Sequence, residues 1–259
     1  MFREILARIQ QGHRTLRYPA GPPPPPPERF RGRPTIDSSQ CPNGCKACAD
    51  ACPTGAISIA DKARIDLGKC LFCTDCVQAC PEGALSYSGD HRLSTRTREA
   101  LVVAEDEQLQ LAEALDRKLR RLFGRSLKLR QVSAGGCNAC EADVNVLGTV
   151  GWDLSRFGIQ MVASPRHADG LLITGCVTEN MQLALQKTYD AVPPPKIVIA
   201  VGACAISGGP YLESPRQLRG ASSTVPVDLY IPGCPPHPLT ILDGLLRLLG
   251  RIEGRDRGS

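Results

Sequence analysis

Residues 70–81 read C-L-F-C-T-D-C-V-Q-A-C-P. Three cysteines follow one another at two-residue gaps, a fourth comes after three residues, and a proline follows it directly. A second run, residues 41–53, reads C-P-N-G-C-K-A-C-A-D-A-C-P and also ends in Cys-Pro. Its first gap holds three residues, and we expect Gly44 to absorb the extra length in a wider loop.

A duplication extends beyond the cysteine runs. Residues 52–59 read C-P-T-G-A-I-S-I, and residues 80–87 read C-P-E-G-A-L-S-Y. In each copy a turn, Thr54-Gly55 or Glu82-Gly83, leads into a short strand that we expect at residues 56–59 and 84–87. Because the two halves repeat, we expect both to bind the same kind of group.

Four cysteines at this spacing are typical of bacterial two-cluster ferredoxins. Each run supplies three thiolates to one 4Fe–4S cluster, and its fourth cysteine ligates the other cluster. This crossed ligation predicts two sites: one on Cys41, Cys45, Cys48 and Cys80, and one on Cys70, Cys73, Cys76 and Cys52. Two clusters side by side are typical of electron transfer.

Other uses of cysteine fit this sequence less well. Structural zinc sites use paired C-x-x-C units that are usually farther apart within one site. A disulfide framework suits a small secreted chain, and we see no signal peptide at the start of this sequence. We therefore expect most of the thirteen cysteines to be reduced and metal-bound.

Length and charge restrict the possible classes of protein. The 259 residues suggest about two domains, and a hydrophobic content of 42% is ordinary for a globular protein. No stretch approaches the roughly 18 consecutive apolar residues of a membrane-spanning helix. The formal charge of +5 is concentrated in residues 1–40, where seven arginines and three carboxylates give +4. These totals indicate a basic arm rather than a basic protein, and we predict no nucleic-acid partner.

The arm, residues 1–34, combines two unlike segments. Apolar residues near helical spacing predict an amphipathic helix over residues 2–16. Its basic charge suits anionic lipid headgroups or an acidic subunit surface, and a solvated helix packed on its own protein is the alternative. Six prolines at residues 22–27 then predict a stiff polyproline linker. We discount an SH3-type ligand there, because the prolines lie between two segments that look structural.

The remaining chain divides into a connector, a second domain and a tail. After the two-cluster domain at residues 35–95, residues 97–123 predict one connecting helix that Gly124 ends, within a connector at residues 96–124. Residues 125–250 alternate strands with helices, which predicts an α/β domain with an open, flavodoxin-like, doubly wound parallel sheet. Residues 251–259 form a tail. The expected strands are residues 127–132, 159–163, 171–174, 197–201 and 228–231, and the expected helices are residues 139–147, 179–189 and 239–249.

Cysteines recur after the strands of this second domain. Cys137 and Cys140 follow the first strand, Cys176 the third, Cys204 the fourth and Cys234 the fifth. The carboxyl ends of parallel strands lie at one edge of a sheet, so we expect one further cluster site there. Three cubane clusters need twelve ligands, which leaves one of the thirteen cysteines over. Cys176 is the odd one out, and we interpret it as a small buried hydrophobe.

Residues 130–250 resemble the family that contains the small subunits of membrane-bound nickel–iron hydrogenases and the matching subunit of respiratory complex I. The motifs G-G-C-N-A-C-E, S-P-R-H-A-D-G-L-L-I-T-G, G-A-C-A-I-S-G-G-P-Y and P-G-C-P-P-H-P carry this resemblance. Residues 1–90, with T-L-R-Y-P, R-G-R-P and both cysteine runs, resemble the two-cluster ferredoxin subunit of the same complexes. The two subunits are fused in this sequence. Complex I subunits of this type carry adjacent cysteines, whereas the C-x-x-C here is similar to the formate-hydrogenlyase branch.

The resemblance implies a non-catalytic electron-transfer subunit of an oxidoreductase complex. It implies one proximal 4Fe–4S cluster on Cys137, Cys140, Cys204 and Cys234, and therefore three clusters in all. The implied partners are a nickel–iron-hydrogenase-like large subunit, membrane-embedded complex I-like subunits, and a ferredoxin or a donor dehydrogenase module. The implied location is peripheral, at the cytoplasmic face of the inner membrane.

Three other functions remain open from the residues. A complex-I-like quinone oxidoreductase would use the same line of clusters with a quinone as terminal partner. A free-standing ferredoxin-like carrier explains residues 35–90 but gives the second domain no function. A structural zinc module predicts tetrahedral zinc and no redox signal. Glu141, directly after Cys140, either tunes the cluster, relays protons, or interacts with the dipole of the helix that begins there.

Overall fold

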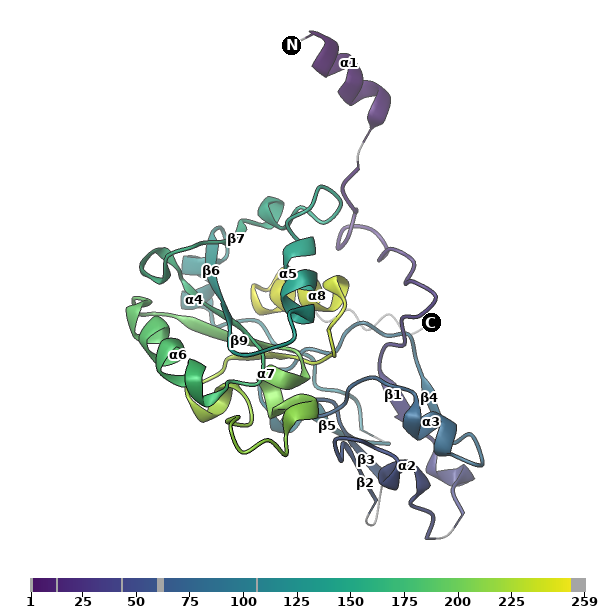
Figure 1. Ribbon diagram of the computed structural model, residues 1–259. Helices are drawn as coiled ribbons and strands as arrows, with labels where there is room; N and C mark the ends of the chain where they lie inside the picture. Colours follow the sequence, from purple (N-terminus) through teal and green to yellow (C-terminus); the bar gives the residue numbers. More distant parts are fainter. Residues whose placement is uncertain (1, 13, 43, 60–62, 106, 253–259) are drawn as a thin grey trace.

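The computed structural model describes residues 2–12, 14–42, 44–59, 63–105 and 107–252. Two modules lie against each other, and an N-terminal helix stands off from both (Figure 1). We call residues 35–95, which carry both cysteine runs, the first module. We call residues 125–250, which carry the parallel sheet, the second module.

The second module contains a five-stranded parallel sheet. Its spatial order is β7-β6-β8-β9-β10. Renumbered from the start of the module, this is the order 2-1-3-4-5 of flavodoxin-like sheets, whose switch point lies between β6 and β8. The structure thus confirms the predicted fold class. The strands are β6 (Leu127–Ser133), β7 (Ile159–Met161), β8 (Gly170–Thr174), β9 (Ile197–Val201) and β10 (Leu229–Ile231).

Both faces of this sheet are covered. Successive side chains of a strand point to opposite faces, so Leu171 and Ile173 of β8 join one hydrophobic cluster while Leu172 joins the other. This two-sided burial explains why β8 and β9 are buried at every position. The helices are α5 (Ala139–Val146), α6 (Glu179–Ala191), α7 (Ala203–Ser207) and α8 (Pro238–Leu248), with 3-10 turns η3 (Leu154–Phe157), η4 (Pro165–His167), η5 (Gly209–Tyr211) and η6 (Ala221–Ser223).

The first module is built from short strands that flank the cysteine loops. The strands β2 and β4 begin one residue later than the sequence predicts, at Ile57 and Leu85. β4 pairs with β1, and β2 pairs with β3, which pairs with β5. The elements are β1 (Pro34–Ile36), η1 (Ser38–Gln40), α2 (Ala47–Asp50), β2 (Ile57–Ile59), β3 (Ala63–Asp66), α3 (Asp75–Ala79) and β4 (Leu85–Tyr87). The connector contributes β5 (Val102–Ala104).

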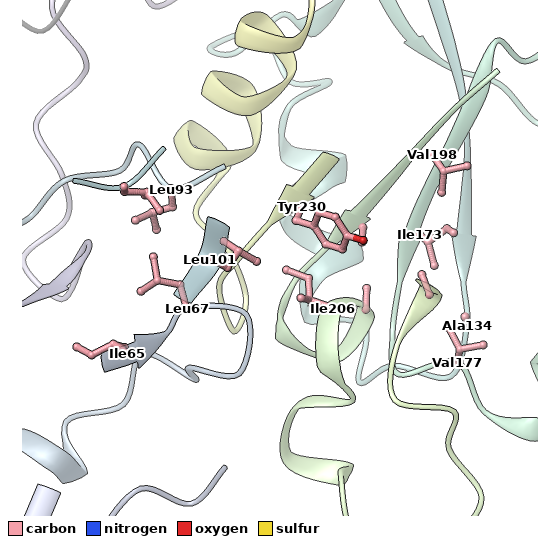
Figure 2. Close-up of a cluster of buried hydrophobic side chains, with 14 of the residues drawn as sticks. Ile65, Leu67, Leu93, Leu101, Ala134, Ile173, Val177, Val198, Ile206 and Tyr230 are labelled. Carbon is pink, nitrogen blue, oxygen red and sulfur yellow. The ribbon is translucent and has the colours of Figure 1, made fainter. Parts of the chain in front are cut away.

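The two modules share one hydrophobic cluster. Figure 2 shows Leu67 of the first module and Leu101 of the connector beside Ile206 of α7. A Cβ added at Gly68 would lie 2.8 Å from Ile206 Cγ2, so the backbone of the first module closely approaches the second. The Ser207 hydroxyl, buried nearby, donates to the Gly68 carbonyl at 2.9 Å. Because this contact is apolar and closely packed, the modules are held in a defined relative position.

The prediction of one helix over residues 97–123 was wrong. These residues form a 3-10 turn, η2 (Glu99–Leu101), then the strand β5, and only later α4 (Arg117–Phe123), with residues 107–116 outside helices and strands. β5 adds to the edge of β3, with Val103 opposite Ile65, so strand pairing overrides the helix propensity of this alanine- and leucine-rich segment. The Asp116 carboxylate caps α4 by accepting from the Lys118 and Leu119 amides, and Gly124 ends it as predicted.

The N-terminal arm is anchored on the second module. The Tyr18 side chain is buried, and its hydroxyl donates to Asp243 Oδ1 at 2.6 Å. Arg247 Nε donates to the other oxygen of Asp243 at 2.7 Å. Before this anchor, the described part of the arm contains α1 (Phe2–Gln11), shorter than the predicted residues 2–16, with residue 13 outside the described residues. No helix within the described residues meets the length and hydropathy of a bilayer-spanning segment.

Candidate iron–sulfur sites

The duplicated turns place a backbone donor on each crossing cysteine. The Ala56 amide donates to Cys52 Sγ at 3.2 Å, and the Ala84 amide donates to Cys80 Sγ at 3.3 Å. In both copies the preceding glycine has a positive φ, +58° at Gly55 and +67° at Gly83, which turns the chain back toward the sulfur. Hydrogen bonds to sulfur stabilise thiolates and tune cluster potentials.

Four cysteines of the first module line one cavity, which we call the inner site. Cys52 of the first run lies there with Cys70, Cys73 and Cys76 of the second run, around an empty volume of about 370 Å³. The rest of the lining is largely apolar and includes Tyr87, whose hydroxyl donates to the Cys73 carbonyl. Burial raises the pKa of the Cys70 thiol to about 12.

The other four cysteines of this module form the outer site. Burial raises the pKa of Cys41, and the neighbouring Cys80 and Cys45 raise it further. The pKa of Cys48 is also raised, chiefly by burial, with added effects of Cys80 and Cys41. Cys80 therefore lies with the first run although it belongs to the second. Gly44 has φ +78° in the longer gap, next to Asn43, which is outside the described residues.

A third group of cysteines lies at the carboxyl edge of the parallel sheet, and we call it the proximal site. Cys137 and Cys140 precede and begin α5, Cys204 lies in α7, and Cys234 follows β10. Burial raises the pKa of Cys140, and Cys204, Glu141, Cys234 and Cys137 add to it. Burial also raises the pKa of Cys204 to about 12, with Cys234 the next largest cause.

Two glycines leave room for these sulfurs. A Cβ at Gly202 would lie 2.5 Å from Cys140 Sγ, and a Cβ at Gly209 would lie 2.8 Å from Cys204 Sγ. Both glycines have a positive φ, +91° and +56°. The backbone at these two glycines therefore lies so close to the sulfurs that a side chain would not fit. Such close packing is expected around ligands that need exact placement.

Cys176 lies beside the proximal site, where it adds to the raised pKa of Cys204 after burial and Cys234. Its side chain is 3% exposed, and its Sγ donates to the Gly135 carbonyl at 3.5 Å. Its interpretation as a small buried residue rather than a ligand stays a prediction.

The three sites form a series. Cys76 of the inner site is electrostatically coupled to Cys48 of the outer site. Cys73 of the inner site contributes to the raised pKa of Cys234 of the proximal site. Both cysteines line a groove of about 1210 Å³ between the modules. The order is therefore outer, inner, proximal.

The three sites share one kind of donor, the cysteine sulfur. In a 4Fe–4S cluster each thiolate binds a different iron of the cube. The donor set, the N–H···S bonds and the glycine cradles fit the cluster.

Glu141 is buried beside the proximal site. Its Oε1 accepts from Ser133 Oγ and from Thr174 Oγ1, each at 2.6 Å. Burial alone would raise its pKa, but these hydrogen bonds outweigh burial, and the pKa lies below its usual value. Ser133 and Thr174 were not among the predicted site residues. A signal was available, since each is the polar last residue of its strand.

Comparison with known proteins agrees with this geometry. Residues 137–248 match the family described as NADH ubiquinone oxidoreductase, 20 Kd subunit, and residues 40–84 match the 4Fe-4S dicluster domain. A probable membrane-bound hydrogenase subunit of Pyrococcus furiosus is 40% identical over 142 residues, which are 55% of this chain and 85% of the relative. The chain belongs to the NADH ubiquinone oxidoreductase 20 kDa subunit family.

Other members of the 20 kDa subunit family lie in several kinds of oxidoreductase. An NADH-quinone oxidoreductase subunit of Clostridium beijerinckii is 44% identical over 118 residues, covering 45% of this chain and 70% of the relative. Formate hydrogenlyase subunit 7 of Escherichia coli is 43% identical over 135 residues, covering 52% of this chain and 53% of the relative. The chain is thus an iron–sulfur electron-transfer subunit of the hydrogenase and complex I-like class.

Proposed function

We propose that this chain carries three 4Fe–4S clusters in a membrane-associated, formate-hydrogenlyase-like nickel–iron hydrogenase complex. It would connect a ferredoxin or a donor dehydrogenase module to the active site of a partner large subunit. The series of outer, inner and proximal sites supports this function most directly, because Cys76 couples to Cys48 and Cys73 couples to Cys234. Such a series gives single electrons a path from one module to the other.

The twelve cysteines of the three sites would hold the clusters. When bound, a 4Fe–4S cluster accepts and releases one electron at a time. The chain itself sets the spacing of the sites and excludes water from the inner site. Its backbone amides also donate hydrogen bonds to the sulfurs of Cys52, Cys70 and Cys80. These are the means by which a protein sets the potential of a cluster.

The exposure of the proximal site supports a partner at that edge of the sheet. Cys137 and Cys234 are exposed, whereas Cys140 and Cys204 are buried. A large subunit that covers Cys137 and Cys234 would bring its active site close to the proximal cluster. The C-x-x-C at Cys137 and Cys140 favours a hydrogenase-type partner.

A complex-I-like quinone oxidoreductase is the second candidate. The 44% identity to the NADH-quinone oxidoreductase subunit of Clostridium beijerinckii supports it. The two candidates share every site in this chain and differ in the terminal partner, which is a nickel–iron centre in one and a quinone in the other.

The co-purifying large subunit tests the proposal. A partner with two C-x-x-C pairs that binds nickel is the expected result, and a partner without them would contradict the hydrogenase assignment and favour the quinone reductase. Iron and acid-labile sulfide on the anaerobically purified complex test the cluster count. After subtraction of the partners' iron, about twelve iron and twelve sulfide per chain are expected from three cubanes. A count of about eight of each would show that the proximal cluster is absent.

We also propose peripheral attachment at the cytoplasmic face of the inner membrane, and the N-terminal helix supports the attachment itself. None of the residues of α1 is buried, and its apolar face is open, with Phe2 76% and Ile9 71% exposed. Arg3 and Arg8 accompany this face, and the helix stands off from the body (Figure 1). An amphipathic basic helix of this kind suits an interface of anionic lipid headgroups.

A vesicle-binding assay tests this attachment. We expect the I5S/I9S variant to lose binding to vesicles that contain anionic lipid, since about half of the apolar face is removed. The control is Leu183→Ser, because Leu183 is an equally exposed apolar residue (63%) on α6. Equal binding by both variants would contradict a membrane role for α1.

A further inference from the structure

The motif R-G-R-P, which begins at Arg31, fastens the N-terminal arm to the first module. The Arg31 carbonyl accepts from the Gly89 amide at 2.9 Å, and the Arg33 amide donates to the Asp90 carbonyl at 3.1 Å. Gly32, between them, is buried and has φ +71°. A Cβ at Gly32 would clash with the backbone of Gly89 and Asp90. The backbone at Arg31 is therefore fixed by a close approach that glycine allows.

From this fixed backbone, the Arg31 side chain reaches the loop of the second cysteine run. Its Nη1 donates to the Phe72 carbonyl at 2.7 Å, across 41 positions of the chain. Phe72 lies between Cys70 and Cys73 of the inner site, and its own amide donates to Cys70 Sγ at 3.3 Å. One loop residue thus accepts from the arm and donates to a sulfur of the inner site.

The backbone of Phe72 has a conformation that needs support. Its φ is +53°, a value that a residue with a Cβ adopts only at a cost in free energy. That cost is similar in size to the net contribution of one hydrogen bond from a charged donor, so the bond from Arg31 can offset it. Without the bond, we expect φ of Phe72 to return to a negative value. This rotation would turn the Phe72 N–H away from Cys70 Sγ.

The position of Arg31 explains more than its charge does. The residue is exposed, so water and salt screen the field of its guanidinium group. The hydrogen bond to Phe72 acts through the backbone instead, and the Phe72 amide contacts the sulfur directly.

We propose that Arg31 is a positioning residue for the inner cluster, which holds the Phe72 amide on the Cys70 sulfur and so raises the reduction potential of that cluster. This inference rests on the proposed function, because it requires a cluster at the inner site. Reduction adds one electron and makes the site more negative by one unit, with no bond formed or broken. The Phe72 amide stabilises the added charge, since a donor to an anionic sulfur binds more strongly as the sulfur becomes more negative.

An EPR-monitored redox titration of the complex, purified anaerobically with the full chain and reduced with sodium dithionite, tests the proposal. Arg31→Gln removes the guanidinium group that reaches Phe72. We expect the ratio of reduced to oxidised inner cluster at a fixed applied potential to fall about tenfold, which is 59 mV for a one-electron couple. The outer and proximal clusters keep their potentials.

Arg29→Gln is the matched control for charge. Arg29 is also exposed and lines the same groove as Arg31 and Phe72. R29Q removes the same charge but leaves the bond between Arg31 and Phe72 in place. We expect it to hold the ratio within about twofold of the wild type, because water screens the charge.

A double variant tests the backbone argument. Phe72→Gly lets the loop adopt a positive φ at little cost, because glycine has no Cβ. If Arg31 acts by supporting this conformation, adding R31Q to the F72G chain should change the ratio by less than about twofold. If R31Q alone fails to load the inner cluster, the F72G/R31Q chain is expected to load it.

An unchanged inner potential in R31Q would overturn the proposal. An equal fall in R29Q would also overturn it, since the effect would then come from charge. The same holds for an R31Q effect that is undiminished in the F72G chain, or for an inner cluster that F72G does not restore. A wild-type complex with no inner-cluster signal would instead contradict the three-cluster function itself.

Discussion

The approach of Gly202 to Cys140 makes a quantitative prediction about the proximal site. A Cβ at Gly202 would lie 2.5 Å from Cys140 Sγ, whereas non-bonded heavy atoms rest about 3.5–4.0 Å apart. Gly202→Ala therefore forces the sulfur, or the β9–α7 turn, to move by about 1 Å. Metal–ligand distances tolerate only about 0.2 Å of error, so this displacement is several times too large for ligation. The φ of +91° adds about 1–2 kcal/mol of backbone strain.

We expect G202A to load two clusters instead of three. The assay is iron and acid-labile sulfide on the anaerobically purified complex, with about eight of each per chain in place of about twelve, together with loss of one EPR signal. The control is Gly89→Ala, because Gly89 also has a positive φ (+70°) but a Cβ there meets nothing within 4 Å. G89A should keep the full count. A full iron count and a normal proximal signal in G202A would refute the reasoning that this close approach places the ligand.

Three further predictions concern the cysteine that is left over, the arm and the interface. Cys176→Ala is expected to keep about twelve irons per chain, whereas Cys204→Ala is expected to keep about eight, as measured by the same assay. Tyr18→Phe leaves one oxygen of the buried Asp243 without its donor, and should lower the free energy of unfolding by about 1.5–3 kcal/mol in anaerobic denaturant titrations. Ile206→Ala removes a buried contact between the modules and should cost about 2–5 kcal/mol in the same titrations.

Each of these three predictions has its own control or contradicting result. Loss of iron in C176A would show that Cys176 is a ligand. For the arm, Tyr211→Phe removes a hydroxyl from a side chain that is 43% exposed and should change stability by less than about 0.5 kcal/mol. Equal effects of Y18F and Y211F would contradict the anchoring role of Tyr18. For the interface, an I206A protein as stable as the wild type would show that the contact with Leu67 and Leu101 contributes little.

Much of the cysteine arrangement could be predicted because it is local in sequence. The turns before Ala56 and Ala84 depend on a few adjacent residues, and the glycines at positions 55 and 83 have the expected left-handed backbone. The grouping of Cys52 with the second run could also be predicted, since the crossed pattern follows from the duplication, and all four cysteines line one cavity. The assignment of twelve ligands stays a prediction until the clusters are measured.

The connector shows where local reasoning failed. Residues 97–123 have the composition of a helix, yet Val102–Ala104 form a strand because β3 offers an unpaired edge. Helix propensity is worth at most about 1 kcal/mol per residue, and the burial of Leu101 between the modules is worth about as much or more. No pattern within the segment reveals the edge to which it pairs.

The sequence by itself determined the three groups of thiols, the parallel sheet and the turns that present the sulfurs, because spacing and periodicity are properties of neighbouring residues. Only the tertiary structure decided that Cys73 lies near Cys234, that Tyr18 bonds to Asp243, and that Ser133 and Thr174 enclose Glu141. These contacts join residues far apart in the chain. They form because burying apolar surface between the two modules brings the residues together and because the buried polar groups must then find partners.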